Sequence, residues 1–523
     1  MAVLLILTTL DRADAAEVPL VDSLLAQDRG DWHLGVLGAD LGHEDPRIDS
    51  IASPADVWNA GHDLVTLLDP GTNLHPGAVG HLVDAMGARP DADAVYGDDI
   101  RPRDPTWPLR LRPAWSPEAI RASWCVGDPF VVRRRALESW MPPDSSRASR
   151  YRMALEMVER DASVVHLPCP LATLDQPPAA DWSPVDVVDG HLRRCQVPAR
   201  AVAGPEPGTV RLEPAFTEPP PVSVVVPTAG ARDPDGSRLV ARCLASLDQL
   251  DWPELEIVVV VGDEYDGDPA DLATAGRHPV RIVRRTPGEF SFATAVNTGV
   301  LAAHGDLVVL LNDDTEALDG DWLSRLAVHA LDPAVGAVGV TLLFPDETIQ
   351  HVGMVVDDAR PLHPFVGQRA DDDGPRVITS HPRTVAAVTA ACLAVERHKY
   401  LAVGGLSERF PLSFNDVDLC FKLARHGHRT VHEPGARLIH HEGASRHGSI
   451  ELWEWDRFIH RWGLVEDPWY HPGYVRPRDP DDPRRDGDHL LPADPPCDPR
   501  PRDTVLRPTV HRARPEGPAV DTR

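Results

Sequence analysis

Paired cysteines are missing from this sequence of 523 residues. Its seven cysteines are scattered and form no C-x-x-C pair, which argues against a cysteine-based zinc site or a disulfide framework. We therefore expect reduced thiols and a cytoplasmic protein. Basic residues are also scarce: 52 Lys and Arg stand against 80 Asp and Glu, for a formal net charge of -28. Non-specific nucleic-acid binding needs a basic footprint, so no nucleic acid is expected as a partner.

Long apolar runs are missing as well. No stretch reaches the roughly 18 consecutive apolar residues that a membrane-spanning helix needs, so none is expected. The apolar start at residues 3–7 has no basic segment before it, and Asp11 and Arg12 follow soon after, which favours a first buried strand over a signal peptide. The length and the 42% hydrophobic content suffice for two or three domains with sizeable cores.

One stretch organises the rest of the chain. Residues 307–311 form a short apolar run that predicts a buried strand, and Asn312, Asp313 and Asp314 follow it directly. Open α/β sheets bind their ligands at the carboxyl ends of their strands. Carboxylate oxygens suit Mg2+ or Mn2+, and these ions commonly bridge protein acids to substrate phosphates. The pattern predicts a metal site, with a solvated acidic turn as the alternative.

Residues 63–72 resemble residues 306–315. Aligned without gaps, the two segments share identical Asp, Leu, Val, Leu, Leu and Thr positions. A repeat of this kind indicates two copies of one domain, and chance similarity of two buried strands is the alternative. The first copy has Pro70 and Gly71 where the second has its two acids. Neither residue carries a carboxylate, so the first copy is expected to have lost the metal site.

Strand-like and helix-like segments alternate through both halves of the chain. Near-continuous apolar strands between helical patterns indicate an α/β fold with mostly parallel sheets covered on both faces. A Pro-rich joint at residues 218–221 marks a domain boundary. In order, we expect a degenerate first domain, a connector with one helix, a second domain with the acid pair and a disordered tail, over residues 1–180, 181–220, 221–475 and 476–523.

Two further segments of the first half carry expectations. Ser116 and Pro117 predict the start of a helix, with the serine as its cap and the proline at the first helical position. Asp98 and Asp99 close a strand-like run that begins at Ala94. We expect these two acids in a solvated turn, with a fallback metal site as the alternative.

The second half resembles an inverting family 2 glycosyltransferase with the GT-A fold. The resemblance rests on the order and spacing of motifs at residues 224–228, 295–299, 312–314, 335–339, 346–353, 389–392, 414–420 and 437–445. The most specific are Phe414-Asn415-Asp416-Val417-Asp418-Leu419-Cys420 and Arg437-Leu438-Ile439-His440-His441-Glu442-Gly443-Ala444-Ser445. The first half is similar to the first domain of two-domain bacterial members of the rhamnosyl or galactofuranosyl type, which act on surface polysaccharides, at residues 94–99, 112–117 and 131–134. The resemblance implies two GT-A-like domains, the first of them degenerate.

The resemblance also implies a metal and its ligands. A divalent ion, Mg2+ or Mn2+, would stabilise the leaving diphosphate of a nucleoside diphosphate sugar. Asp314 is implied as the principal ligand, and Asp313 contacts either the metal or the nucleotide. The D-x-D motif of the family begins with Asp, whereas Asn312 stands there in this sequence, so fewer protein charges hold the metal. His440 is implied as the third ligand, with His441 as the alternative.

The implied general base is Asp416. It matches the second position of the E-D motif of the family, and Asn415 replaces the Glu. Asp418 is the competing candidate. A role as helix cap is the other reading of Asp416, but Asn415 fits that role better and leaves Asp416 free.

The implied nucleotide contacts lie at the ends of the first strands of the second domain. Pro227 and Thr228 end the first strand, and Asn297 is expected to line the pocket. The family usually has an Asp at the end of the second strand, where this chain has Val261, so a nearby acid is the substitute. The substitute acid is Asp263. Arg284 is the arginine expected near the phosphates, with Arg285 as the alternative.

Three functions compete. The leading one is a glycosyltransferase that uses a nucleoside diphosphate sugar and a glycan or lipid-linked glycan acceptor in cell-surface polysaccharide synthesis, in the cytoplasm or at the inner face of the plasma membrane. The second is a non-catalytic sugar- or nucleotide-binding scaffold. The third, a nucleotidyltransferase, would need a Gly-rich basic loop, of which residues 229–232 are a poor version. Peripheral membrane contact and helix packing are alternative roles for Trp453, Trp455, Trp462 and Trp469.

Overall fold

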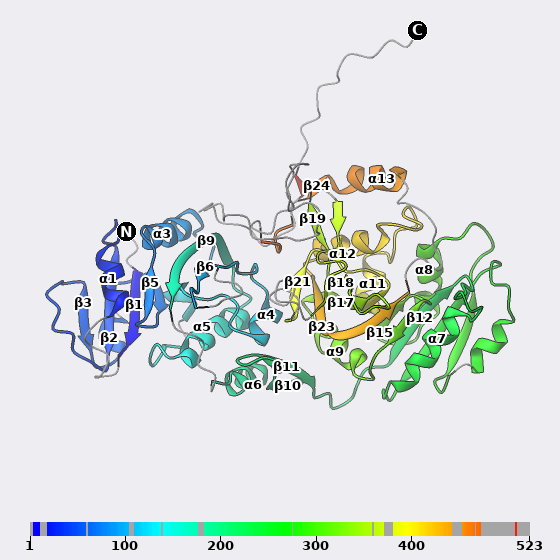
Figure 1. Ribbon diagram of the computed structural model, residues 1–523, viewed down its shortest axis with the longest axis horizontal. Helices are drawn as coiled ribbons and strands as arrows, with labels where there is room; N and C mark the ends of the chain where they lie inside the picture. The colour runs from blue at the N-terminus through cyan, green and yellow to red at the C-terminus, as the bar shows by residue number, and fades with distance from the viewer. Residues whose placement is uncertain are drawn as a thin grey trace, which may run out of the picture.

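The structure consists of two α/β bodies, each built around one large sheet. Figure 1 shows them side by side, with the first half of the chain in blue to cyan and the second in green to orange. The computed structural model describes residues 4–10, 18–58, 61–103, 109–137, 140–175, 182–274, 276–357, 360–370, 380–441, 452–465, 467–471 and 508–509. The tail that we expect to be disordered lies outside these ranges, apart from strand β25 (Pro508–Thr509).

The first sheet has the strand order β3-β2-β1-β4-β8-β6-β9-β5, and β7 pairs with β6. Strands β1 to β4 run parallel to one another, and β8 is antiparallel to both β4 and β6. The bounds in chain order are β1 (Leu4–Thr9), β2 (Trp32–Leu37), β3 (Ile48–Ile51), β4 (Leu64–Leu67), β5 (Thr72–Leu74), β6 (Ala94–Ile100), β7 (Leu109–Arg110), β8 (Phe130–Arg133) and β9 (Val164–Leu174).

The second sheet has the order β14-β13-β12-β15-β22-β17-β23-β16, with β18 on β17 and β21 on β23. Element for element, this is the order of the first sheet, and the repeat predicted from two short segments extends through both sheets. The bounds are β12 (Val222–Thr228), β13 (Leu255–Val261), β14 (Val280–Arg284), β15 (Leu307–Leu311), β16 (Thr315–Ala317), β17 (Val335–Leu343), β18 (Ile349–His351), β21 (Arg383–Val385), β22 (Cys392–Glu396) and β23 (Arg429–His440).

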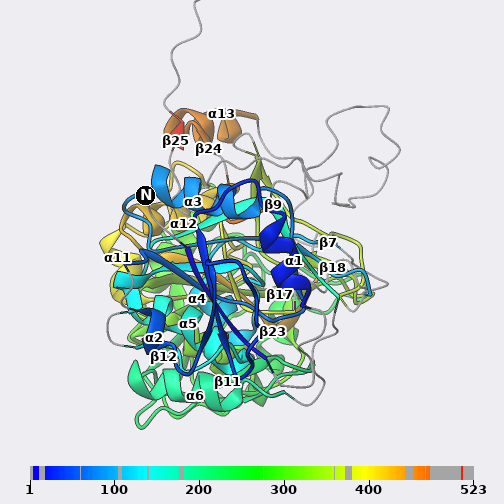
Figure 2. The ribbon, with the colours of Figure 1, turned by 90° about the vertical axis from the view of Figure 1, so that its left-hand side faces the viewer.

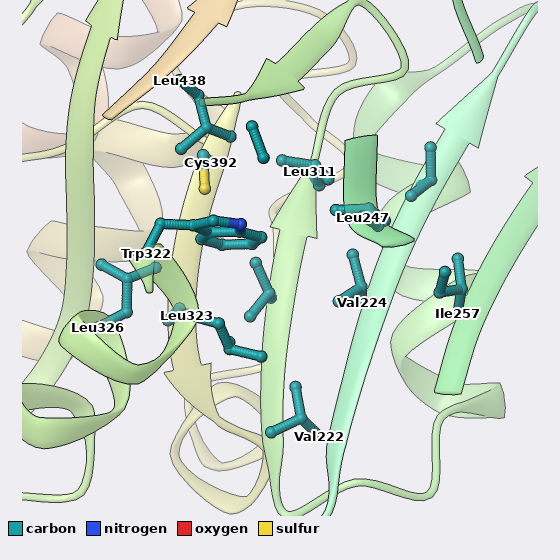
Figure 3. Packing of buried hydrophobic residues seen from close by; sticks show 14 of the residues in the cluster. Val222, Val224, Leu247, Ile257, Leu311, Trp322, Leu323, Leu326, Cys392 and Leu438 are labelled. Atoms are coloured by element: carbon teal, nitrogen blue, oxygen red, sulfur yellow. The ribbon is translucent and has the colours of Figure 1, made fainter. Parts of the chain in front are cut away.

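Helices cover both faces of each sheet, as expected. In the first domain, one face packs against α1 (Pro19–Leu25) and α3 (Ala78–Ala88), and the other against α4 (Pro117–Ala122), α5 (Arg147–Glu159) and α6 (Val185–Arg194). In the second domain, one face packs against α7 (Leu239–Ser246) and α9 (Trp322–Ala330), and the other against α8 (Phe292–Ala302), α11 (Arg397–Ala402), α12 (Asn415–Arg425) and α13 (Leu452–Trp462). Figure 3 shows Trp322 of α9 lying over the sheet between Cys392 and Leu323.

Two parts of the fold differ from the sequence expectations. Mostly parallel sheets are expected, but β22 lies antiparallel between β15 and β17, so the second sheet is mixed at this point. The connector contains a hairpin, β10 (Ala199–Ala203) with β11 (Val210–Pro214), in addition to its helix. Its half-exposed strands lack the continuous apolar run that made the sheet strands recognisable. In the end-on view of Figure 2, α6 and β11 lie at the opposite edge from α13.

Two composition-based expectations agree with the described residues. None of the described cysteines is in a disulfide. In the ranges that the structure describes, no helix has both the length and the apolar character needed to span a membrane.

Helix α4 joins the first domain to the second. Ser116 caps it, as the sequence predicts, by accepting a hydrogen bond from Ala119 N at 3.3 Å. The same hydroxyl oxygen accepts a hydrogen bond from Thr384 N of β21 at 3.0 Å. In the first turn of α4, the buried Glu118 pairs with Arg429 of β23 at 2.9 Å. Figure 1 shows α4 and β21 facing each other between the two bodies.

Replacing Glu118 by glutamine is expected to destabilise the fold by about 3 kcal/mol near neutral pH, because Arg429 loses its buried partner. Burial raises the pKa of Glu118, but Arg429 and Arg121 outweigh burial and bring the pKa from 4.5 to about 2. A carboxyl with a lowered folded-state pKa stabilises fully above its unfolded value and loses this effect as the pH falls towards its folded value. In urea unfolding, the difference in free energy of unfolding between wild type and E118Q should therefore narrow from pH 4.5 down to about 2. A difference that does not change with pH would contradict an ionised Glu118 paired with Arg429.

Candidate functional site

The carboxyl ends of the parallel strands of the second sheet form one edge. Thr228 at the end of β12 lies opposite Val261 of β13, which lies opposite Arg284 of β14. Strand β15 runs parallel to β12 and ends at Leu311, so the segment 312–314 emerges at the same edge. This is the position where open α/β sheets bind ligands.

Strand pairing brings His440 to the acid pair. Strand β16 runs antiparallel to β23, with Thr315 opposite His440, so His440 becomes a neighbour of Asp314. His440 Nε2 lies 3.1 Å from Asp314 Oδ1 and 3.3 Å from Asn312 Nδ2. The structure thus brings together three of the residues that the resemblance singled out.

Gln350 sets the tautomer of His440. The amide nitrogen of Gln350 donates to the backbone oxygen of His440 at 3.3 Å, so its Oε1 faces the ring. His440 Nδ1 lies 2.6 Å from that oxygen and must donate its proton to it. In the neutral ring, Nε2 then carries the lone pair, with Asn312 Nδ2 and Asp314 Oδ1 as its polar neighbours. Sequence reasoning missed this role, although Gln350 stands inside one of the motifs that carry the resemblance.

The donor atoms around His440 fit a divalent cation. Asp314 Oδ1 and Asn312 Oδ1 are buried and accept no hydrogen bond from the described residues. Asp314 Oδ1 and His440 Nε2 lie 3.1 Å apart, so a carboxylate and a neutral imidazole could share a cation there. Carboxylate, amide and imidazole donors suit Mg2+ or Mn2+.

Asp313 points elsewhere. Its Oδ2 accepts a hydrogen bond from Thr228 Oγ1 at 2.6 Å. Among the described residues, Asp313, Asp314 and His440 do not form a group with all three ligand atoms within 4.8 Å. Burial, followed by the charge of Asp314, raises the pKa of Asp313 to about 7. Its hydrogen bond thus ties Asp313 to the end of β12, away from His440.

The alternative ligand His441 has another partner. Its Nε2 lies 2.7 Å from Glu316 Oε1, and Arg242 Nε lies 3.1 Å from the same oxygen. Since successive side chains of a strand point to opposite faces, His441 is directed away from the side on which His440 lies. The geometry therefore favours His440.

Asp416 lies in the first turn of α12. Its Oδ2 accepts a hydrogen bond from Ala390 N at 3.1 Å. The next residue, Ala391, accepts at its backbone oxygen from Asn312 N at 2.9 Å. One short segment thus links Asp416 to the acid pair. Asp416 is only half-buried, so its carboxylate remains accessible to an acceptor.

The two residues beside Asp416 have structural roles. Asp418 is fully buried and receives a hydrogen bond from Trp462 Nε1 at 2.9 Å, and Arg461 Nε lies 2.9 Å from the same oxygen. The expectation that Asn415 caps the helix is wrong, because Phe414 is the cap residue, with left-handed backbone at φ 63°. Asn415 is the first helical residue and its amide donates to a backbone oxygen at 3.2 Å.

The nucleotide-side candidates divide into two groups. Thr228 is buried beside Asp313, and Pro227 precedes it in β12. Asp263 and Arg284 are both exposed near the ends of their strands. These four remain available as donor contacts. The alternative Arg285 is buried and pairs with a glutamate of its own domain.

Asn297 is placed differently from our expectation. Its Oδ1 accepts from Tyr400 Oη at 2.6 Å and from Leu406 N at 3.0 Å. Its Nδ2 donates to Leu406 O at 2.9 Å and to Glu408 Oε1 at 3.4 Å. All four hydrogen-bonding positions of the amide are occupied, so Asn297 ties α8 to α11 and to the segment after it.

The first domain lacks each of these features at the equivalent place. Pro70 and Gly71 follow β4 where the second domain has its acids. Thr72 of β5 lies opposite Leu174 of β9, so leucine stands where the second domain has His440. Asp69 bonds to Gly71 N at 3.0 Å. The first sheet therefore has the same strand arrangement around this position but lacks the side chains that could bind a metal there.

Known proteins are similar to this chain over both halves. The O-antigen biosynthesis protein RfbC of Myxococcus xanthus is 30% identical over 433 residues, which are 78% of this chain and 34% of that protein. The N-acetylglucosaminyl-diphospho-decaprenol L-rhamnosyltransferase of Mycobacterium tuberculosis is 28% identical over 229 residues, which are 39% of this chain and 72% of that protein. The chain thus spans about a third of the length of the first relative.

A solved structure and a protein family also match. The crystal structure of GalNAc-T7 with UDP, GalNAc and Mn2+ covers 46% of this chain and 49% of its own at 14% identity, with a TM-score of 0.37. The family described as "Glycosyltransferase like family 2" matches residues 219–463. These residues contain the second sheet, the acid pair and His440. Over these residues, the second domain matches glycosyltransferase family 2.

Proposed function

We propose that this chain is a metal-dependent inverting glycosyltransferase. It moves a sugar from a nucleoside diphosphate to a hydroxyl group of a glycan or lipid-linked glycan. One observation carries the proposal: Asp314 Oδ1 and His440 Nε2 lie 3.1 Å apart, at the sheet edge where a nucleotide sugar would bind. A carboxylate and a neutral imidazole at this distance can share a cation, and a cation at that edge would serve a diphosphate.

Each residue then has a chemical task. A bound Mg2+ or Mn2+ supplies positive charge to the leaving diphosphate. Asp314 and His440 hold the ion, with Asn312 as a neutral neighbour, and Gln350 orients His440. Asp416 accepts the proton of the acceptor hydroxyl. Asp313, Thr228, Pro227, Asp263 and Arg284 contact the donor nucleotide.

The first domain is non-catalytic in this proposal. The acids and the histidine of the second domain are replaced there by Pro70, Gly71 and Leu174. It shapes the acceptor groove or docks a partner. The similarity to an O-antigen biosynthesis protein supports a role in surface polysaccharide synthesis.

A thermal-shift experiment tests the donor site. UDP, dTDP and GDP are added with and without Mn2+ to wild type and to the Asp314→Ala variant. A nucleotide at about 100 times its dissociation constant should stabilise the fold by roughly 2.7 kcal/mol. We expect one nucleotide to give a Mn2+-dependent shift that the variant loses. If no nucleotide gives a shift, the non-catalytic scaffold becomes the better description.

We place the acceptor side near α13, at a membrane surface with anionic headgroups. Leu452 and Trp453 of this helix are 74% and 45% exposed, whereas Trp462 is buried against Phe421. Beside them lies a surface hollow lined by Arg409, Phe410, Arg425, Arg457, His460 and Arg461. Exposed apolar side chains next to arginines are typical of an interfacial helix, at the inner face of the plasma membrane in this proposal.

Vesicle co-sedimentation tests the membrane contact. Wild type should sediment with phosphatidylglycerol vesicles, and replacing both Leu452 and Trp453 by serine should reduce the bound fraction about tenfold. Leu301 to serine, another exposed apolar residue but on α8, is the control. Equal binding by all three proteins would exclude this helix as the contact.

A further inference from the structure

A second group of metal-ligand side chains lies outside the candidate active site. Asp98 of β6, His166 of β9 and His471 are all buried, and one ligand atom from each lies within 4.8 Å of the other two. The expectation of a solvated turn at Asp98 and Asp99 is therefore wrong, because both acids are wholly buried. The pairing of β6 with β9 draws this part of the chain into the sheet.

Both imidazoles point at one carboxylate. His166 Nε2 lies 3.1 Å from Asp98 Oδ1, and His471 Nε2 lies 3.0 Å from Oδ2. Arg112 N donates to Oδ1 at 2.8 Å, and the ring of Tyr96 stacks on that of His166 with centroids 4.8 Å apart. Contacts from outside the group thus fix the carboxylate and one imidazole, as outer partners do for metal ligands.

The donor set is that of a zinc-class ion. Imidazole nitrogens with one carboxylate oxygen bind Zn2+ and related divalent ions of the first transition row. Asp99 has its own arginines, Arg101 and Arg112. The side-chain partners of Asp98 are the two histidines, together with any ion that they bind.

Among the described residues, the equivalent place in the second sheet has no such group of three metal-ligand side chains. His166 lies opposite Tyr96, and His432 of β23 lies opposite Gly339 of β17 in the same way. Two residues further along, Thr341 replaces the aspartate, with its Oγ1 3.1 Å from His432 Nε2. A threonine hydroxyl is a poor ligand for such an ion. The repeat therefore supplies one histidine, whereas the aspartate is particular to the first domain.

The third ligand comes from the other domain. Asp467 Oδ1 accepts from Trp469 N at 2.9 Å and from Tyr470 N at 3.2 Å, which forms a turn just before His471. Asp467 Oδ2 accepts from Val356 N at 3.2 Å, in strand β19 (Val355–Asp357) of the second domain. The turn is thus held by the second domain while its histidine reaches into the first.

We propose that Asp98, His166 and His471 bind a structural Zn2+ that cross-links the two domains. The ion is distinct from the catalytic cation, because its ligands lie on the first sheet and on the segment after α13. The other described group of this kind, Glu159 with His191 and Cys195, already has Arg194 on its glutamate and Arg121 on its histidine. That group is saturated by arginines and carries no proposal.

The test uses the full chain with the donor site disabled by Asp314→Ala. After chelation, this protein is titrated with Co2+ as a visible probe and then with Zn2+. We expect one equivalent of Co2+ with visible absorption, displaced by Zn2+, and a rise in melting temperature on Zn2+ addition. Adding His471→Gln should weaken Co2+ binding by about 100-fold and remove the temperature rise. Adding His441→Gln instead is the matched histidine control and should change neither.

Two results would overturn the site. Absence of stoichiometric Co2+ binding in the Asp314→Ala protein excludes it without any further variant, so the test does not depend on the folding of the His471 variant. Equal Co2+ affinity with and without His471 excludes the proposed ligands. In either case the three side chains would form only a hydrogen-bonded contact between the domains.

Discussion

Replacing Asp314 by alanine is expected to reduce sugar transfer by about 1,000-fold or more, because the variant loses the charged ligand of the catalytic cation. Asn312 and His440, which remain beside the lost carboxylate, are weaker ligands for Mg2+ or Mn2+ than a carboxylate. Saturating donor should not restore the rate, since the lost interaction is stronger in the transition state than in the bound substrate. Initial rates over a range of Mn2+ concentrations measure the effect.

The control for this variant is Asp306→Asn. Asp306 is an exposed acid at the other end of the same strand, β15, so this change tests for effects of charge on the strand alone. It should leave the rate within about twofold of wild type, as surface substitutions usually have small effects. A residual rate above about one tenth of wild type for Asp314→Ala would contradict metal-assisted departure of the diphosphate.

Asp416→Asn is expected to lower kcat by about 100- to 10,000-fold, the range for loss of a general base. The amide oxygen can still accept the hydrogen bond from Ala390 N, so the fold and donor binding should be nearly unchanged. The measurement is a full kinetic analysis with thermal unfolding alongside. The predicted signature is a fall in kcat with an unchanged KM for the donor, because an interaction made only in the transition state is removed.

The neighbouring acid gives a contrasting result. Asp418→Asn weakens the pairing with Arg461 and with Lys422, which lies 3.4 Å from the other oxygen, so it should lower the melting temperature first. If Asp418→Asn abolished transfer at unchanged stability while Asp416→Asn remained active, the two roles would have to be exchanged.

Sequence pattern alone determined the frame of this protein. The strand at 307–311 was predicted with its observed bounds, because a continuous apolar run between turns leaves little alternative to a buried strand. The resemblance between 63–72 and 306–315 predicted a repeat that both sheets bear out in strand order. The family followed from the order and spacing of the motifs, and the match over residues 219–463 confirms it.

Tertiary structure decided which polar side chains meet. Asn297 stands in a motif that suggests a nucleotide contact, but the fold packs it against the segment after α11, where its amide is saturated. Gln350 gave no chemical signal of its own, and it acquires a role only because β18 lies beside β17 and brings it to His440. Sequence spacing does not encode such contacts, since they depend on which strands pair and in which register.

The same reason explains the buried group at Asp98. Next to one another in sequence, Asp98 and Asp99 look like a solvated acidic turn. In the fold they are wholly buried, because β6 pairs with β9 on one side and His471 arrives from the far end of the chain. Local pattern determines which segments are strands. Whether a charged side chain is buried, and which partners it has, depends on elements hundreds of residues apart, which only the tertiary structure brings together.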